Sequence, residues 1–292
     1  MAQTATGRRW WAIPGYAAFF VAAFAFFLWR ELPYPEIARS LENRLRARGT
    51  EVSIRGLGPG GFPGVRAERV RVKVPGAGDA VLEFTDVGVR AALGSLVRAR
   101  PEVEVKARAL GGTVRVWIHA GDRVDVRAEW SECDLGRLPL PRDLAGLALA
   151  GSTDGHLEVA DVRAPPARAE GRAEVRLRDL RIGPGKVKGV PVPGLALGDG
   201  VIRIKASRGR VNVEEARLEG GDVGVVLSNA TVALRQPLSR SLVNGLLAVS
   251  PNEKARRDLA LLFALFPGGP GSDGRYTARV RGSLGRLRLV RR

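Results

Sequence analysis

The sequence predicts a mainly β protein that one N-terminal helix attaches to a membrane. Three observations predict this fold class: an uncharged run over residues 10–29, an alternation of aliphatic and charged residues after residue 51, and an apolar helical segment near residues 251–266. We expect a transmembrane helix, a short amphipathic helix, and then an elongated, curved or twisted, mostly antiparallel β-sheet with one helix in its C-terminal half.

The first of these features, residues 10–29, predicts a single transmembrane anchor. The run WWAIPGYAAFFVAAFAFFLW contains twenty residues without a charge. A helix of this length spans roughly 30 Å, which matches the hydrocarbon core of a bilayer. Aromatic residues expected to contact the lipid chains and the two membrane interfaces are Trp10, Trp11, Tyr16, Phe19, Phe20, Phe24, Phe27 and Trp29.

Two other interpretations of this run stay open. A cleaved signal peptide would use the small residues of Ala23-Phe24-Ala25, but the mature chain would then begin with four large apolar residues. A buried helix of a soluble core fits poorly, because five of the nine phenylalanines and three of the five tryptophans lie in the run. The basic tail of residues 1–9 favours a cytosolic N-terminus. Since long domains cross membranes largely regardless of their charge, we expect the rest of the chain in the periplasm.

Residues 30–50 predict a membrane-proximal amphipathic helix. Ile37, Leu41 and Leu45 recur at four-residue spacing, Pro35 suits the first helical position, and Gly49 suits the end of the helix. One narrow apolar stripe of this kind packs against a sheet or rests on the membrane surface, and packing is the more common role.

Residues 51–292 predict a β-rich domain. Val70-Arg71-Val72-Lys73-Val74 alternates strictly, which is typical of a half-buried antiparallel strand. The same alternation occurs in residues 114–118, 124–130, 173–177, 202–205, 211–213 and 278–280. A Gly-Gly pair precedes a strand at Gly111-Gly112 and again at Gly220-Gly221, so two related halves meeting near residues 183–200 and one continuous sheet are both compatible with the sequence.

A helix is expected near residues 251–266. Ser250-Pro251-Asn252-Glu253 has the pattern of a capping box with proline at the first helical position. The apolar residues of this helix indicate a plug over one end of the β core or, alternatively, a contact with lipid or a partner protein. The candidates for this contact are Leu259, Leu262, Phe263 and Phe266.

No catalytic, metal-binding or cofactor-binding set is expected, and we predict that the protein is not an enzyme. Residues 56–61 match G-x-G-x-x-G, but a strand pattern follows where a nucleotide-binding loop needs a helix, so we interpret them as a glycine-rich turn. His119 and His156 have no ligand-spaced neighbours. Cys133 is the only cysteine, and the adjacent Glu132 and Asp134 disfavour its thiolate.

The net charge of +17 does not by itself indicate a nucleic-acid partner. The chain has 41 arginines and 6 lysines, and they are spread along its whole length. Nucleic-acid-binding proteins more often gather basic residues on one face with exposed aromatic residues. We therefore expect no nucleic-acid partner. Steeply salt-dependent binding to duplex DNA would support the contrary class, a DNA-binding membrane protein.

Several segments after the predicted anchor share their order with known envelope proteins. They are Leu32-Pro33-Tyr34-Pro35-Glu36-Ile37, the strands opening at the two Gly-Gly pairs, the GSTDGHLEV segment of residues 151–159, and the GRYTARVRGSL segment of residues 274–284. In this order the chain resembles the type II secretion system protein N (GspN) family and, more loosely, the AsmA-like proteins. Gly285-Arg286 follows where the GspN family usually has a proline.

The GspN resemblance implies a single-pass protein of the bacterial inner membrane with a β-rich periplasmic domain, a non-catalytic accessory of type II protein secretion that contacts other components of that system. The AsmA-like resemblance implies instead a lipid-binding or lipid-transfer β-groove. An accessory protein needs the apolar face of its sheet closed, whereas a lipid carrier needs it open. About fifteen strands reach only some 70 Å, so a stand-alone bridge across the envelope is disfavoured unless a homo-oligomer forms.

Overall fold

The computed structural model describes most of the chain beyond the predicted anchor. The described residues are 20, 23, 24, 26–47, 49–73, 80–92, 101–139, 148–165, 168, 170–187, 190–235, 240–264, 266–283 and 286–291.

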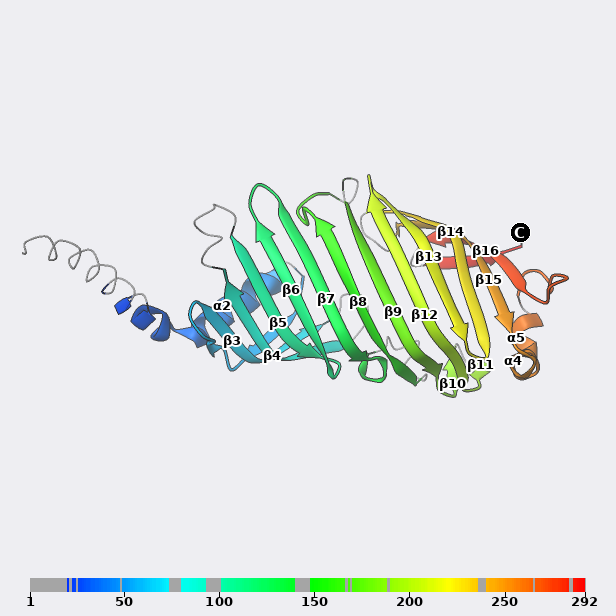
Figure 1. Cartoon of the computed structure of the whole chain (residues 1–292), viewed down its shortest axis with the longest axis horizontal. Coiled ribbons are helices and arrows are strands. Elements are labelled where there is room, and N and C mark those ends of the chain that lie inside the picture. Colours follow the sequence, from blue (N-terminus) through cyan, green and yellow to red (C-terminus); the bar gives the residue numbers. More distant parts are fainter. Residues whose placement is uncertain are drawn as a thin grey trace, which may run out of the picture.

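The described chain forms one long antiparallel sheet of fifteen strands, together with a separate two-stranded hairpin (Figure 1). The large sheet contains β1 (Val52–Arg55), β2 (Gly58–Pro59), β3 (Gly64–Lys73), β4 (Val81–Ala91), β5 (Glu102–Ala109), β6 (Gly112–Ala120), β7 (Val124–Asp134), β8 (Leu149–Ala160), β9 (Glu170–Ile182), β12 (Leu195–Ser207), β13 (Arg210–Gly220), β14 (Val223–Ala233), β15 (Leu242–Pro251), β16 (Tyr276–Ser283) and β17 (Arg286–Val290). The hairpin consists of β10 (Gly185–Val187) and β11 (Val190–Val192).

The strands follow one another in the sheet in chain order, as a meander. Only β2 lies off this path, paired with β3. At about 4.8 Å between neighbouring strands, the sheet is roughly 60 Å long. β9 and β12 pair directly, with Val175 opposite Ile202, so the sheet continues without interruption past residues 183–200. The predicted mainly β, antiparallel fold is confirmed, and all the predicted strand segments lie in strands apart from Val74, which is outside the described residues.

Bulges interrupt the ladders, and aspartates on neighbouring strands satisfy backbone amides at these points. Glu132 and Asp179 have φ of 55° and 50° and lie where the register shifts. Their N–H groups donate to Asp154 Oδ1 and Asp199 Oδ1, each over 2.9 Å. Each aspartate comes from the next strand of the sheet, so a bulge that unpairs an amide is matched by a carboxylate beside it.

Helix α2 (Tyr34–Ala47) packs against β1 at the N-terminal end of the sheet. Its buried residues are Tyr34 and Ala38, whereas Leu41 of the predicted apolar stripe is 42% exposed. Ile37 and Leu45 of the predicted stripe are half-buried, and a membrane contact for Leu41 stays a prediction. Tyr34 enlarges the apolar face one turn before Ile37, and its hydroxyl donates to the Trp29 carbonyl, so the helix turns this side towards the sheet.

The predicted helix of residues 251–266 is two short helices, α4 (Glu253–Asp258) and α5 (Ala260–Ala264). The expected cap at Ser250 is wrong, because Ser250 and Pro251 pair with Gly224 and Val223 and so belong to β15. Asn252 is the N-cap instead, and its side chain accepts a hydrogen bond from the Ala255 amide over 2.8 Å.

Most of the predicted anchor, including Trp10, Trp11, Tyr16 and Phe19, lies outside the described residues, so the anchor stays a prediction. Residues 20, 23, 24 and 26–30 are helical, and Phe20, Phe24 and Phe27 are exposed. Among the helices that the structure describes, none combines the length and the hydropathy needed to cross a membrane.

Asp222 generates a stability prediction, because it joins three elements. Its Oδ2 accepts from the Ala196 amide (3.0 Å) and its Oδ1 from the Asn252 side chain (3.1 Å), and these hydrogen bonds hold its pKa below the usual 3.8. We expect Asp222→Ala to lower the free energy of local opening by roughly 1–3 kcal/mol at pH 7, with faster amide hydrogen exchange in residues 195–200 and 249–255.

The pH dependence of this effect has a definite sign. A carboxyl whose pKa is depressed in the folded state contributes stability above its unfolded pKa and loses it as the pH falls. The difference between the wild type and Asp222→Ala should therefore narrow below pH 4. Asp122→Ala, at an exposed turn, is the control and should leave exchange unchanged. Equal effects of the two substitutions would contradict the prediction.

Candidate functional site

The register of the ladders gathers the aliphatic side chains on one face of the sheet. Directly opposed residues of an antiparallel pair lie on the same face. Val70 is opposite Phe84, Val116 is opposite Ala128, and Val175 is opposite Ile202. The resulting row crosses the sheet through Val72, Leu82, Val105, Val116, Ala128, Leu157, Ala173, Ile204, Val213, Ala230, Gly245, Val280 and Leu289. We call this surface the apolar face.

The apolar face is only half buried between the two ends of the sheet. Its larger side chains, such as Val116, Leu157 and Ile204, are of intermediate exposure. The fully buried positions on it are small residues such as Ala173 and Ala230, which lie beneath their larger neighbours. In the described part of the chain, α2 packs on β1 and α4 on β15, at opposite ends of the strand order. Apart from the single 3-10 turn η1 (Leu135–Arg137), which contacts β8, the strands between these ends present an aliphatic surface without a described α-helix packed on them.

The opposite face carries a ladder of arginines and glutamates. Arg203 forms ion pairs with both Glu174 and Glu215, and Glu174 also pairs with Arg176 over 2.8 Å. The hydrogen bonds from Arg203 and Arg176 lower the pKa of Glu174, so this carboxylate stays ionised. We call this surface the charged face; it is solvated, and its exposed ion pairs contribute little stability each.

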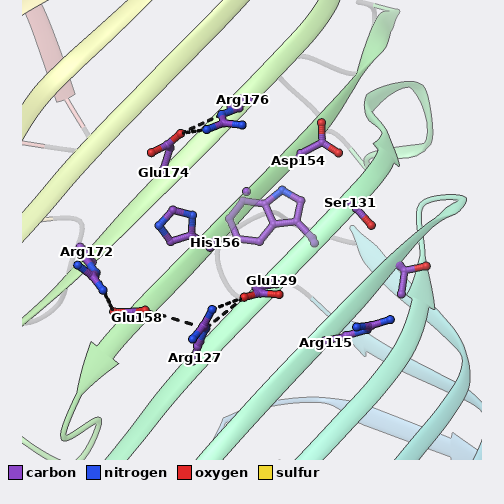
Figure 2. Close-up of a pocket in the computed structure, with 13 residues that line it drawn as sticks. Arg115, Arg127, Glu129, Ser131, Asp154, His156, Glu158, Arg172, Glu174 and Arg176 are labelled. Atoms are coloured by element: carbon purple, nitrogen blue, oxygen red, sulfur yellow. Dashed lines mark hydrogen bonds and ion pairs between the residues drawn. The ribbon is translucent and has the colours of Figure 1, made fainter.

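A hollow of about 770 Å³ lies on the charged face (Figure 2). Arg127, Glu158 and Arg172 form one chain of ion pairs across it. His156 also lines the hollow, whereas His119 is at 3.6 Å from Glu102 on another strand pair. Within the described residues no three His, Cys, Asp or Glu side chains converge as metal ligands would. Most of the lining side chains are charged or polar, with Trp130 as the one large apolar side chain among them, so the hollow suits water and ions more than acyl chains.

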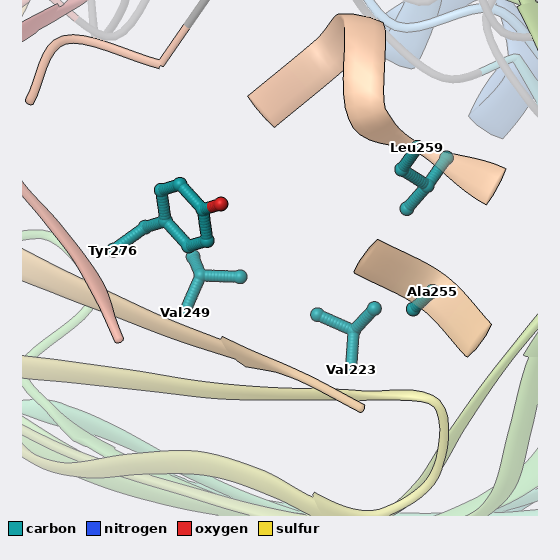
Figure 3. Packing of buried hydrophobic residues seen from close by; sticks show 5 residues of the cluster. All are labelled: Val223, Val249, Ala255, Leu259 and Tyr276. Atoms are coloured by element: carbon teal, nitrogen blue, oxygen red, sulfur yellow. The ribbon is translucent and has the colours of Figure 1, made fainter. Parts of the chain in front are cut away.

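At the C-terminal end, α4 and α5 cover the apolar face (Figure 3). Ala255 and Leu259 pack with Val223, Val249 and Tyr276 of the sheet in one buried cluster. Phe263 stacks on the Tyr276 ring at 4.6 Å between centroids, and Phe266 meets the same ring edge-on at 5.9 Å. Leu259 is 6% exposed. These contacts are those expected of a plug over the end of the sheet. The Leu262 side chain lies outside the described part of the chain. A contact of Phe263 and Phe266 with lipid or a partner protein stays a prediction.

At the N-terminal end, an aromatic cluster links the last residues of the predicted anchor to the sheet. Trp29 Nε1 donates to the Gly64 carbonyl over 3.1 Å, and the rings of Phe26 and Trp29 contact the Phe62 ring. Phe62 was not singled out from the sequence, and its place directly after the glycine-rich turn at residues 56–61 was the available signal. The turn leads into β3 and not into a helix, as predicted. Trp29, the last residue of the predicted anchor, is therefore tied to Phe62 and to the start of β3.

Cys133 is buried on the apolar face side of β7, opposite Thr153. Burial, with a smaller contribution from Asp154, raises the pKa of its thiol. A protonated, buried thiol is a poor nucleophile, so Cys133 is a packing residue.

Comparisons of the chain with family models, with curated proteins and with solved structures gave no match. We therefore infer the function from the two faces and the two ends of the sheet.

The C-terminal plug generates a second prediction. Leu259→Ala should destabilise α4 and α5 by roughly 2–5 kcal/mol, because it leaves a cavity against Val223 and Val249. Amide hydrogen exchange in residues 253–264 measures this loss. The matched control is Leu287→Ala on β17, where the side chain is 52% exposed and the expected change is within about 0.5 kcal/mol. Unchanged exchange in Leu259→Ala would show that the plug is not held by this leucine.

Proposed function

We propose that this protein is a single-pass inner-membrane protein whose periplasmic sheet holds lipid acyl chains on its apolar face, as the AsmA-like resemblance implies. One observation carries the proposal: the register aligns aliphatic residues across the strands of the large sheet, on a face without a described α-helix packed over its middle. The proposed role is non-catalytic and uses no cofactor.

The energetics of the apolar face support a lipid partner. Aliphatic surface left in water costs about 25 cal/mol per Å², so a face of this extent is unfavourable unless an apolar partner covers it. Each methylene of an acyl chain that leaves water contributes about 0.8 kcal/mol. Val, Ile, Leu and Ala side chains offer no directional polar contacts, so the face suits chains that slide along it and does not select one headgroup.

The two ends of the sheet give the proposed carrier a direction. The ring contacts of Phe26 and Trp29 with Phe62 join the N-terminal strands to the end of the predicted anchor, which supports a position of these strands beside the bilayer. The C-terminal end is covered by α4 and α5. We expect lipid to enter from the membrane at β3 and β4, beside α2, which packs on β1. A sheet of roughly 60 Å suits reception and storage of lipid more than transport across a whole envelope.

A second candidate function is the accessory role in type II protein secretion that the GspN resemblance implies. The observation that favours it is the exposed edge of the sheet at β17, where all five residues are exposed. An open strand edge is a site at which other proteins of a secretion machinery bind by adding a strand.

A photocrosslinking experiment tests the lipid proposal in cells that express the full chain. The photoreactive residue p-benzoylphenylalanine replaces Ile202 on the apolar face or, as control, its neighbour Arg203 on the charged face. The pair Val116 and Arg115 on β6 repeats the comparison nearer the membrane. We expect phospholipid adducts, detected by mass spectrometry, at Ile202 and Val116 but not at the two arginines. Adducts in equal yield on both faces, or none on the apolar face, would contradict the proposal.

The proposed topology has a separate test. Alkaline phosphatase fused after Arg292 should be active, since the enzyme folds in the oxidising periplasm. Green fluorescent protein fused at the same position should be dark, since it does not fold when it is exported unfolded to the periplasm. The same fusions made after deletion of residues 10–29 should give the reverse result, because the chain then stays in the cytosol. Active phosphatase in the cytosolic deletion, or inactive phosphatase in the intact chain, would reject the predicted orientation.

A further inference from the structure

The two edges of the sheet are unequal. At the first edge, β1 has only four residues, α2 packs against it, and Glu42 Oε1 accepts a hydrogen bond from the Ile54 amide over 2.5 Å. A helix and a carboxylate therefore occupy this edge, as in proteins that protect an edge from further pairing. At the last edge, no described strand pairs with the outer side of β17, and its residues Arg286 to Val290 are all exposed.

β17 also has an unbalanced side-chain pattern. Leu287 and Leu289 are opposite Gly282 and Val280 and so extend the apolar face, where they are 52% and 44% exposed. Arg286 and Arg288 lie on the charged face. The outer edge thus presents arginine and leucine in alternation, with unpaired backbone N–H and C=O groups between them.

The charge on this edge is not compensated as it is in the middle of the sheet. Arg203 on β12 lies between Glu174 and Glu215 of its two neighbouring strands. Arg288, in contrast, is directly opposite Arg281, and like charges opposite each other are unfavourable. Among the described residues, no carboxylate forms a salt bridge with the charged-face arginines of these two strands, which are Arg279, Arg281, Arg286 and Arg288.

We propose that β17 is a docking edge for an extended segment of another protein in which acidic and apolar residues alternate. Such a segment would add a strand to the sheet by β-augmentation. Its acidic side chains would lie opposite Arg286 and Arg288, and its apolar side chains would lie beside Leu287 and Leu289 and lengthen the apolar face. The proposal does not depend on whether lipid occupies that face.

A second copy of this chain fits the edge less well. β17 contains no carboxylate, so pairing two copies of β17 would put arginine opposite arginine or valine and never opposite an acid. The other edge is occupied by α2 and Glu42, which disfavours head-to-tail addition of copies. Charge complementarity therefore favours a different, acidic protein.

Binding of synthetic peptides to the full-length chain in neutral detergent micelles tests the proposal. The probe is a labelled ten-residue peptide of alternating glutamate and valine, measured by fluorescence anisotropy. We expect it to bind, a lysine–valine peptide to bind at least tenfold more weakly, and an acidic peptide with prolines at alternate positions to lose binding, because proline cannot donate to the ladder. Equal binding of the proline peptide would overturn strand addition.

A charge-reversal variant identifies the edge. Arg286→Glu with Arg288→Glu should weaken binding of the acidic peptide at least tenfold and create binding of the lysine–valine peptide. The matched control, Arg123→Glu with Arg210→Glu, makes the same change in net charge at exposed residues far along the chain from β17 and should leave both affinities within twofold. Equal losses in the two variants would show a bulk charge effect and overturn the docking edge.

The same arginines could instead bind an anionic lipid surface, and the peptide experiments alone would not reveal such binding. Vesicles containing phosphatidylglycerol are therefore tested with the same two variants. The docking edge predicts that peptide binding depends on Arg286 and Arg288. Loss of vesicle binding in that variant, together with no peptide binding to the wild type, would overturn the proposal in favour of an anionic lipid surface.

Discussion

The rest of the structure depends on the antiparallel register of one continuous sheet. In each ladder, a slip by one residue would turn every valine and leucine of that strand to the charged face. The bulges at Glu132 and Asp179 shift the register within a strand and leave the amides of these residues without a partner in the ladder. Aspartates of the neighbouring strands accept hydrogen bonds from these amides. At these two bulges, local irregularity is tolerated without mixing the two faces, because a carboxylate satisfies each unpaired amide.

The single layer of strands has two faces with opposite chemistry. The charged face is exposed to water, and its side chains form ion pairs with one another, such as Arg203 with Glu174 and Glu215. The apolar face has Ala173 and Ala230 buried beneath larger side chains, and those larger side chains are only half buried. A layered protein would bury such a face against a second sheet or a row of helices. The contrast between the faces is the physical basis of the proposal that lipid covers one side while water covers the other.

The ends of the sheet differ from its middle and from each other. Tyr34 of α2 and Leu259 after α4 are both buried, so each end has a helix held by a large apolar side chain. Glu42 blocks the first edge, whereas β17 leaves the last edge open. The sheet therefore has one end joined to the residues of the predicted anchor and one end with an open strand edge, and the lipid and secretion proposals concern different surfaces of it.

The sequence by itself determined the fold class, because side chains alternate with period 2 in any strand and the aliphatic and charged residues follow that period from Val70 to Val280. It also indicated the helices near both ends and the glycine-rich turn at residues 56–61. Only the tertiary structure decided the cap at Asn252, since strand pairing with β14 draws Ser250 and Pro251 out of the helix. It also decided the exposure of Leu41, the bulges, and the open edge at β17. Each of these depends on which segments become neighbours, and one strand's own pattern is the same whether its apolar side meets a second layer, a lipid or water.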